Sequence, residues 1–181
     1  MLNFPELRFL ALFFVLLGLS GCGSTPAERS KTLVTEAHTL MRRDTEIAEQ
    51  WSREFSQVFT LENRAQFPSN RDWLISRSER IITLLDESAR VGNEAAAKLE
   101  EASRLMGKDQ DKKGMTLVAA ALRKDVEIGQ LFKALAQLAS DRTINDAKSF
   151  NQKFDQLTSL YQQKRKESDE QLAEGKRLLR W

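Results

Sequence analysis

Few side chains in this 181-residue chain have the type and spacing that chemistry requires. His38 is the only histidine and Cys22 the only cysteine. One imidazole cannot build a transition-metal site alone, and the residues around His38 lack the Glu-x-x-His spacing of carboxylate-bridged metal bundles. A glycine-rich phosphate loop and a Gly-x-Ser-x-Gly nucleophile motif are also missing. We therefore expect no metal, no cofactor and no enzymatic activity, although motifs do not exclude a hydrolase built from carboxylates alone.

Two acidic residues occupy positions where a helical stripe calls for apolar side chains. Asp44 and Asp125 lie on such stripes, and counting along the helices places both near the level of Tyr161. A phenol can donate a hydrogen bond to a carboxylate. One hypothesis is a polar layer of Asp44, Asp125 and Tyr161 that senses a ligand or sets the helix register. The alternative is that both acids lie at the edge of their stripes and reach solvent, because a buried unpaired acid is costly.

Aromatic residues gather around the first predicted helix–helix turn, at the end of the molecule opposite Cys22. They are Trp51, Phe55, Phe59, Phe67 and Trp73. One interpretation is a core that seals the hairpin, since aromatic rings dominate core energetics. The other is a docking surface for a protein partner, because exposed apolar patches mark interfaces.

The C-terminal sequence GKRLLRW combines cations with an amphipathic ring. Lys176, Arg177, Arg180 and Trp181 suit contact with anionic head groups and the membrane interface. The polar stretch over residues 164–170 would loosen the last helix and let its final turns splay onto a bilayer. The alternative is that basic residues end this helix because they suit its dipole.

A short apolar run precedes the single cysteine. Residues 9–19 read FLALFFVLLGL, about half the length that a membrane-spanning helix needs. A run of this length near the N-terminus, followed by small residues, is typical of a secretory signal peptide. We therefore predict that residues 1–21 are a signal peptide.

The four residues Leu19, Ser20, Gly21 and Cys22 resemble the lipobox of bacterial lipoproteins. The resemblance identifies a class of processing rather than a protein family. It implies cleavage before Cys22, a diacylglyceryl group on its sulfur, and residues 22–24 as the lipidated anchor. Two or more acyl chains anchor a protein stably in a membrane. The alternative is an ordinary signal peptide followed by an unpaired thiol, which is a liability in an oxidising compartment.

The residue after the cysteine is Gly23 rather than aspartate. By resemblance to the sorting rule of enteric bacteria, this favours the outer membrane, with the body of the protein facing the periplasm. The expected location is thus the cell envelope of a Gram-negative host. The membrane, reached through the lipid on Cys22, is the first expected partner.

The rest of the chain has the composition of a helical protein. Charged residues make up 30% of the whole chain, yet the net charge is only +2, which argues against a nucleic-acid partner. Strong helix formers dominate, while glycine and proline are scarce. Four helices are predicted: from a capping box at Thr25 to about residue 65, from Ser69 to about 106, from about 112 to 139, and onward from Thr143 and Asp146.

Apolar residues recur at steps of three and four along these helices. The second helix has the longest stripe, at Leu74, Ser78, Ile81, Leu85, Ser88, Gly92, Ala95, Leu99, Ala102 and Met106. Such steps indicate helix-on-helix packing of coiled-coil character. Short connections make neighbouring helices antiparallel. We predict that residues 25–181 form an elongated, up-down-up-down, all-α four-helix bundle; the alternative is an open three-helix or hairpin arrangement that closes by dimerisation.

These patterns lead to two functional hypotheses. The first is a non-enzymatic, lipid-anchored adaptor or scaffold that binds a protein partner or self-associates. The second is an envelope carrier or sensor that holds a lipid or small apolar ligand in its core. The small residues Ser88, Gly92 and Ala95, expected to face Phe150 and Phe154, suggest the second hypothesis.

Overall fold

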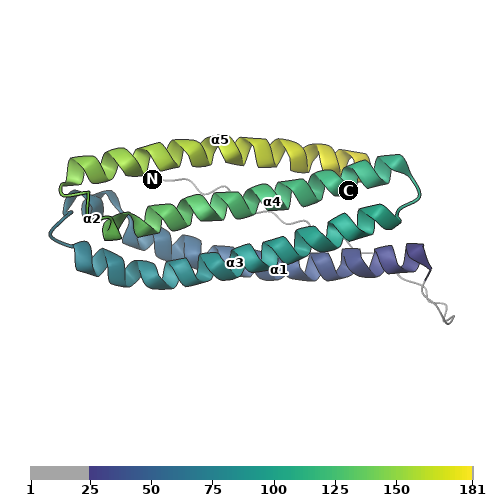
Figure 1. Cartoon of the computed structure of the whole chain (residues 1–181), viewed down its shortest axis with the longest axis horizontal. Helices are drawn as coiled ribbons and strands as arrows, with labels where there is room; N and C mark the ends of the chain where they lie inside the picture. Colours follow the sequence, from purple (N-terminus) through teal and green to yellow (C-terminus); the bar gives the residue numbers. More distant parts are fainter. Residues whose placement is uncertain (1–24, 181) are drawn as a thin grey trace.

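The computed structural model describes residues 25–180, and these residues form helices only (Figure 1). The elements are α1 (Pro26–Val58), α2 (Leu61–Ala65), α3 (Arg71–Leu105), α4 (Asp109–Gln137), the 3-10 turn η1 (Leu138–Ser140) and α5 (Ala147–Leu179). The predicted all-α class is therefore confirmed, and four long helices account for most of the described residues.

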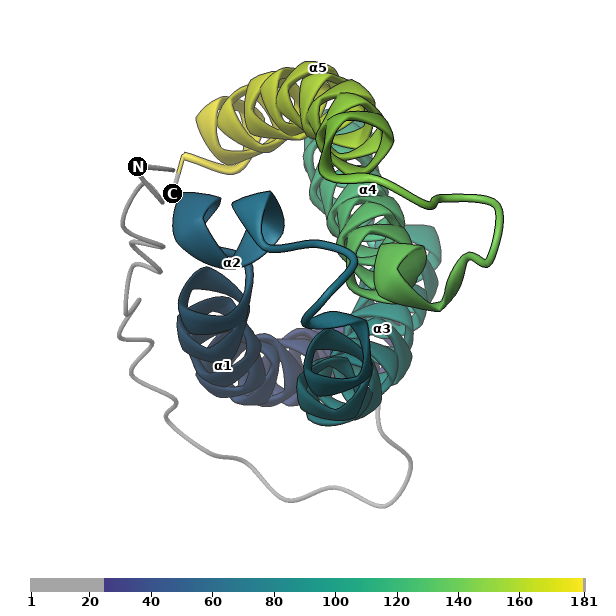
Figure 2. The ribbon, with the colours of Figure 1, turned by 90° about the vertical axis from the view of Figure 1, so that its left-hand side faces the viewer.

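The four long helices run antiparallel to their neighbours along the chain. α1 packs along α3, α3 along α4, and α4 along α5, which confirms the predicted up-down-up-down bundle (Figure 1). The short helix α2 lies between α1 and α5 at one end (Figure 2). We call this end, where α1 leads through α2 into α3 and α4 leads into α5, the tip. The opposite end, with the start of α1, the α3–α4 turn and the end of α5, is the base.

The predicted capping box begins α1. The Thr25 hydroxyl accepts a hydrogen bond from the Glu28 N–H at 3.2 Å, and the Glu28 carboxylate accepts one from the Thr25 N–H at 2.8 Å. Pro26 occupies the first helical position, where its missing N–H costs nothing. This start is confirmed, and it fixes the position at which the bundle begins.

The predicted end of the first helix near residue 65 is wrong, because α1 ends at Val58 and α2 follows as a separate helix. The Thr60 hydroxyl accepts from the Asn63 N–H at 3.1 Å and so begins α2. The Asn63 side chain donates to the Val58 carbonyl at 2.9 Å. These local side-chain bonds compete with the helical ladder and turn the chain.

The remaining helix starts differ from the predictions in detail. α3 begins after Asn70 without a side-chain cap, and the predicted cap Ser69 instead donates to the Gln66 carbonyl. α4 begins at Asp109, three residues before the predicted start. Asp146 caps α5 by accepting from the Ser149 N–H at 2.8 Å.

The core consists of two clusters of buried residues in series along the bundle. The tip cluster is rich in aromatic rings and contains Phe55, Val58, Phe59, Phe67, Leu74, Ile81, Leu85, Ile128, Phe132, Leu135, Ala136, Leu138, Ala139, Ile144, Phe150 and Phe154. The base cluster is made of smaller side chains: Ala37, Ala95, Ala96, Leu99, Met115, Val118, Ala119 and Leu122. The space between the four helices is therefore filled with large side chains at the tip and with small ones at the base.

Two glycines let α4 and α5 approach closely near the base. A Cβ atom added to Gly175 would lie 3.0 Å from the Gly114 carbonyl oxygen and 2.9 Å from Val118 Cγ2. A Cβ added to Gly114 would lie 2.7 Å from Leu179 Cγ. Contacts of 2.7–2.9 Å are shorter than real Cβ atoms make, so a larger residue at either position would force a neighbouring side chain or the helix itself to shift.

Candidate functional site

The two core clusters are separated by a layer of polar side chains. Ser88 of α3 donates from Oγ to Asp44 Oδ1 of α1 at 2.5 Å. Ser168 of α5 donates from Oγ to Asp125 Oδ1 of α4 at 2.8 Å, and also to the Ala121 carbonyl at 3.2 Å. We call Asp44, Ser88, Asp125, Arg165 and Ser168 the polar layer. Each long helix contributes at least one of its members.

Within the polar layer, the pKa of Asp44 is the one most strongly shifted from its ordinary value. Burial raises its pKa to about 6, the hydrogen bond from Ser88 acts in the opposite direction, and the charge of Asp125 raises it further. A Cβ added to Gly92 would lie 3.0 Å from Val126 Cγ2 and 3.6 Å from Asp44 Oδ2, so this small residue of α3 lies beside the carboxyl and tightly against Val126. Asp44 can consequently exchange a proton near neutral pH.

Asp125 has a different electrostatic environment, because a cation faces it. Burial raises the pKa of Asp125, while the Ser168 hydrogen bond and the Arg165 charge lower it and Asp169 raises it. Arg165 Nη1 lies 3.5 Å from Asp125 Oδ1, and Nη2 lies 3.0 Å from Asp169 Oδ1. The guanidinium thus joins the inner carboxylate to one on the surface of α5.

Tyr161 takes a place beside the polar layer that differs from the predicted one. Its ring packs edge-on against Phe132 with centroids 5.0 Å apart, and burial raises the pKa of the phenol. Among residues 25–180, the hydroxyl donors to Asp44 and Asp125 are Ser88 and Ser168. The predicted hydrogen bond from Tyr161 is therefore replaced by two serine bonds. Asp44 and Asp125 are both half-buried. Their exposure is thus intermediate between a fully buried polar layer and a position at the solvent-exposed edge of the stripe.

The chemistry open to this layer is proton binding. In the part of the chain that the structure describes, no group of three or more His, Cys, Asp and Glu residues could hold a metal ion. His38, also on α1, is half-buried, and burial lowers its pKa. The layer carries carboxyls, hydroxyls and one guanidinium, which suits register setting and proton uptake.

The tip places most of the predicted aromatic cluster inside the protein. Phe55, Phe59 and Phe67 are buried, and Phe67 stacks on Phe150 with centroids 4.5 Å apart. These rings belong to the core, so they cannot contact a partner as the docking hypothesis supposed. Trp51 is half-buried and packs on Phe132 at 4.8 Å.

Trp73 is the member of that cluster which remains on the surface. It is 42% exposed, and the Arg77 guanidinium lies 5.9 Å from the centre of its ring. Leu61, the first residue of α2, is 72% exposed at the same end. The apolar surface of the tip thus comes from Trp73 and from a residue that the sequence interpretation did not include.

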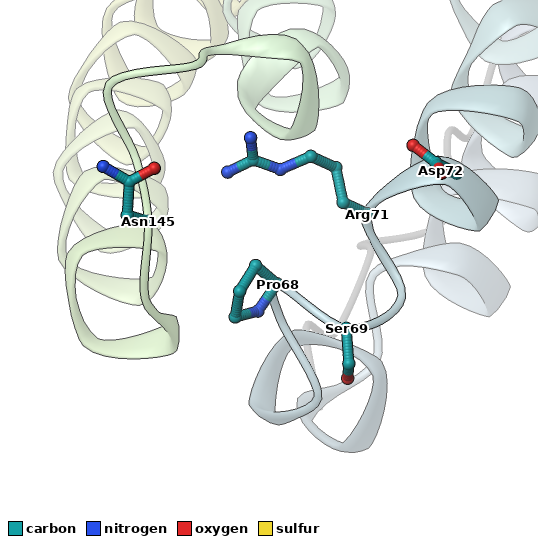
Figure 3. Close-up of a pocket in the computed structure, with 5 residues that line it drawn as sticks. All are labelled: Pro68, Ser69, Arg71, Asp72 and Asn145. Atoms are coloured by element: carbon teal, nitrogen blue, oxygen red, sulfur yellow. The ribbon is translucent and has the colours of Figure 1, made fainter.

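A small pocket at the tip, about 320 Å³ in volume, is lined by Pro68, Ser69, Arg71, Asp72 and Asn145 (Figure 3). The Arg71 side chain extends from the start of α3 toward the α4–α5 connection that holds Asn145 (Figure 3). It donates to the Ile144 carbonyl, and its guanidinium lies 4.8 Å from the centre of the Phe67 ring. Arg71 is thus engaged in joining the α2–α3 and α4–α5 connections.

At the base, the last turns of α5 stay packed on α4. Leu179 covers Gly114, and Gln110 Nε2 donates to the Leu178 carbonyl at 2.8 Å. The predicted splaying of these turns is therefore not observed. Lys176, Arg177 and Arg180 lie at the base, with Arg177 paired to Glu174 at 2.7 Å. The other two predicted membrane residues, Cys22 and Trp181, lie outside the described residues.

The small residues of α3 do not face the rings that the carrier hypothesis required. Gly92 faces Asp44 and Val126, whereas Phe150 and Phe154 lie in the tip cluster. The predicted stripe itself is correct, since eight of its ten residues are buried and the other two half-buried. The pattern of one helix, however, does not predict which residues of the other helices contact its stripe.

Comparison of the chain with protein-family models, with curated proteins and with solved structures returned no match. None of the helices formed by residues 25–180 is both long and apolar enough to cross a membrane.

Proposed function

We propose that this protein is a non-enzymatic, lipid-anchored helical adaptor of the bacterial cell envelope, held in the outer membrane and facing the periplasm. The observation that carries the proposal is the sequence LSGC at the end of a short apolar run, with Cys22 only three residues before the Thr25 helix cap. A cysteine in this place suits lipidation, and two or more acyl chains provide stable anchoring.

The geometry of the bundle supports a role as a short, rigid spacer. Only Gly23 and Ser24 separate Cys22 from Thr25, so the base would lie next to the membrane that holds the lipid. The 35 residues of α3 extend over about 50 Å at 1.5 Å per residue. The tip would then stand about 50 Å from the bilayer surface, where a periplasmic protein partner could bind it.

Two apolar side chains at the tip are exposed to such a partner. Trp73 and Leu61 are exposed, while the rings behind them are packed against one another. This arrangement supports the adaptor hypothesis rather than the carrier hypothesis, because the aromatic volume of the core is already occupied by ring–ring contacts.

The anchor is tested by metabolic labelling with a radioactive fatty acid. Wild type and the neighbouring control Ser24→Ala should both incorporate label, and Cys22→Ser should incorporate none. Mass spectrometry of the N-terminal peptide should show a mature chain that begins at Cys22. Equal labelling of the wild type and Cys22→Ser would contradict the proposal.

The adaptor role is tested at the tip. Trp73→Ala combined with Leu61→Ser should leave lipidation unchanged and lower thermal stability only modestly, because Leu61 is 72% and Trp73 is 42% exposed. Crosslinking to a protein partner in intact envelopes should fall strongly, whereas the surface control Leu160→Ser on α5 should retain it. Crosslinking that is unchanged by the tip substitutions would exclude this surface as the docking site.

A further inference from the structure

Charge is distributed unequally between the two ends of the bundle. The segments 25–29, 104–113 and 176–180 at the base hold eight basic residues, Arg29, Arg104, Lys108, Lys112, Lys113, Lys176, Arg177 and Arg180, and three acidic ones, Glu28, Asp109 and Asp111. The segments 59–72 and 138–149 at the tip hold four basic and four acidic residues. Glu101 and Glu174, which pair with Arg29 and Arg177, border these segments. With these two acids counted, the base has a net charge of +3, while the tip segments are neutral.

The basic side chains of the base are available to a partner. Arg104, Lys108 and Arg180 are exposed, and none of the three forms an ion pair with another described residue. The pairs that do form, such as Arg177 with Glu174, leave the guanidinium largely in water, with 70% of the Arg177 side chain exposed. Such surface pairs are weak and do not withdraw the charge.

Contacts between helices hold the three basic segments together as one surface. Ser30 Oγ donates to the Ala102 carbonyl at 3.2 Å and joins the start of α1 to the end of α3. Gln110 donates to the Leu178 carbonyl and joins the start of α4 to the end of α5. The cations are therefore arranged on a fixed end face rather than on independent tails.

We infer that the base is a lipid-facing surface, which binds the anionic head groups of a phospholipid bilayer and holds the four helices upright on it. Each basic residue near an anionic membrane contributes about 1 kcal/mol, and the effect fades within a Debye length. A cationic end face and a neutral tip thus favour standing on the base over lying flat. The inference rests on the proposed function only for the identity of the membrane, since the charged face exists without the lipid.

The test uses the mature chain from residue 22 with Cys22→Ser, which contains every described helix and no lipid. Binding is measured by co-sedimentation with vesicles of phosphatidylcholine alone and with vesicles in which about a third of the lipid is phosphatidylglycerol. The base variant carries Arg104→Gln, Lys108→Gln and Arg180→Gln. The matched tip variant carries Arg77→Gln, Arg142→Gln and Lys148→Gln, which changes the net charge equally.

The unsubstituted chain should bind the anionic vesicles, and binding should weaken as salt is added. Each lost cation should lower the partition coefficient about fivefold, so the base variant should lose roughly a hundredfold. The tip variant should bind almost as well as the parent chain. Equal losses in both variants, no preference for anionic vesicles, or equally tight binding to DNA at the same salt would overturn the inference. Because this chain has no lipid, its failure to bind would leave the acyl-labelling result for Cys22 unaffected.

The upright orientation can be measured separately. Because Cys22→Ser removes the only cysteine, a single cysteine introduced elsewhere becomes a unique site for a fluorescent dye. Gly107→Cys labels the base at an exposed turn with no neighbouring atom within 4 Å, and Gln66→Cys labels the exposed tip. Energy transfer from each dye to an acceptor lipid in anionic vesicles should be strong for the base and weak for the tip. Equal transfer from both positions would show a bundle that lies flat and would overturn the orientation.

Discussion

The two halves of the bundle are held together by different means. In the tip half, large rings fill the space between helices, and Phe55 lies 5.1 Å from Phe132 and 6.2 Å from Phe154 between centroids. In the base half, small side chains bring the backbones together, until a Cβ no longer fits between Gly114 and Gly175. Removing atoms should therefore cost more stability at the tip than at the base, whereas adding atoms should cost more at the base.

The polar layer lies where one packing mode gives way to the other. Asp44 and Gly92 face each other there, with Val126 nearby, so this level is neither filled by rings nor closed by backbone contact. A layer with specific hydrogen-bond partners can fix the register of helices whose apolar stripes would otherwise slide. Substitutions in the tip half, in the polar layer and in the base half test this difference in packing, and they follow in order of decreasing expected effect on stability.

The largest effect is expected from removing a ring at the tip. Phe55→Ala deletes a side chain that is only 1% exposed and should lower the free energy of unfolding by about 3–5 kcal/mol. Urea denaturation followed by circular dichroism measures the change. The control Trp73→Ala, at the same end but 42% exposed, should cost much less. Equal losses for the two variants would contradict a ring-filled tip.

The second effect concerns the boundary layer and depends on pH. The folded pKa of Asp44 is about 6, compared with 3.8 in its ordinary environment, so the folded state binds the proton more tightly. The stabilisation from this group is complete below pH 4 and is lost as the pH rises through 6. Asp44→Asn should therefore raise the free energy of unfolding on the order of 2 kcal/mol at pH 7.5, with little gain near pH 4.5.

Thermal and urea unfolding of wild type and Asp44→Asn across this pH range provide the measurement. The control Asp86→Asn removes a carboxylate that pairs with Lys133 on the surface at 2.6 Å, and it should show no such gain at pH 7.5. A difference between wild type and Asp44→Asn that does not vary with pH would show that the Asp44 carboxyl is not perturbed by its surroundings.

The smallest effect is expected from adding one methyl group to a helix. Gly175→Ala gains helix propensity, but its Cβ meets backbone atoms of α4 at 3.0–3.1 Å, so a net loss of about 1–2 kcal/mol is expected. Gly129→Ala on α4 places its Cβ 4.0 Å from Leu85 and should gain roughly 0.5–1 kcal/mol. Melting temperatures distinguish the signs, and stabilisation by Gly175→Ala would show that the base tolerates wider helix spacing.

Part of the fold followed from local patterns and part did not. The Thr25–Glu28 cap and the α3 stripe were predicted because caps and periodicity depend on residues within a few positions of one another. The early end of α1 was missed, although the Thr60 and Asn63 spacing could have indicated it. Ser88 lay on the predicted stripe of the second helix, so a small polar residue there was a signal for one of the donors that replace Tyr161.

The helical class, the antiparallel order of the long helices and the position of Cys22 just before the first cap could all be predicted from local sequence patterns. Each of these properties follows from side chains close together along the chain. Helix packing, by contrast, sets which acid meets which serine, which rings are buried, and which glycines touch. Those outcomes depend on the rotation and spacing of helices distant in sequence, so Phe67 became core and Trp73 became surface although both lie beside the same turn.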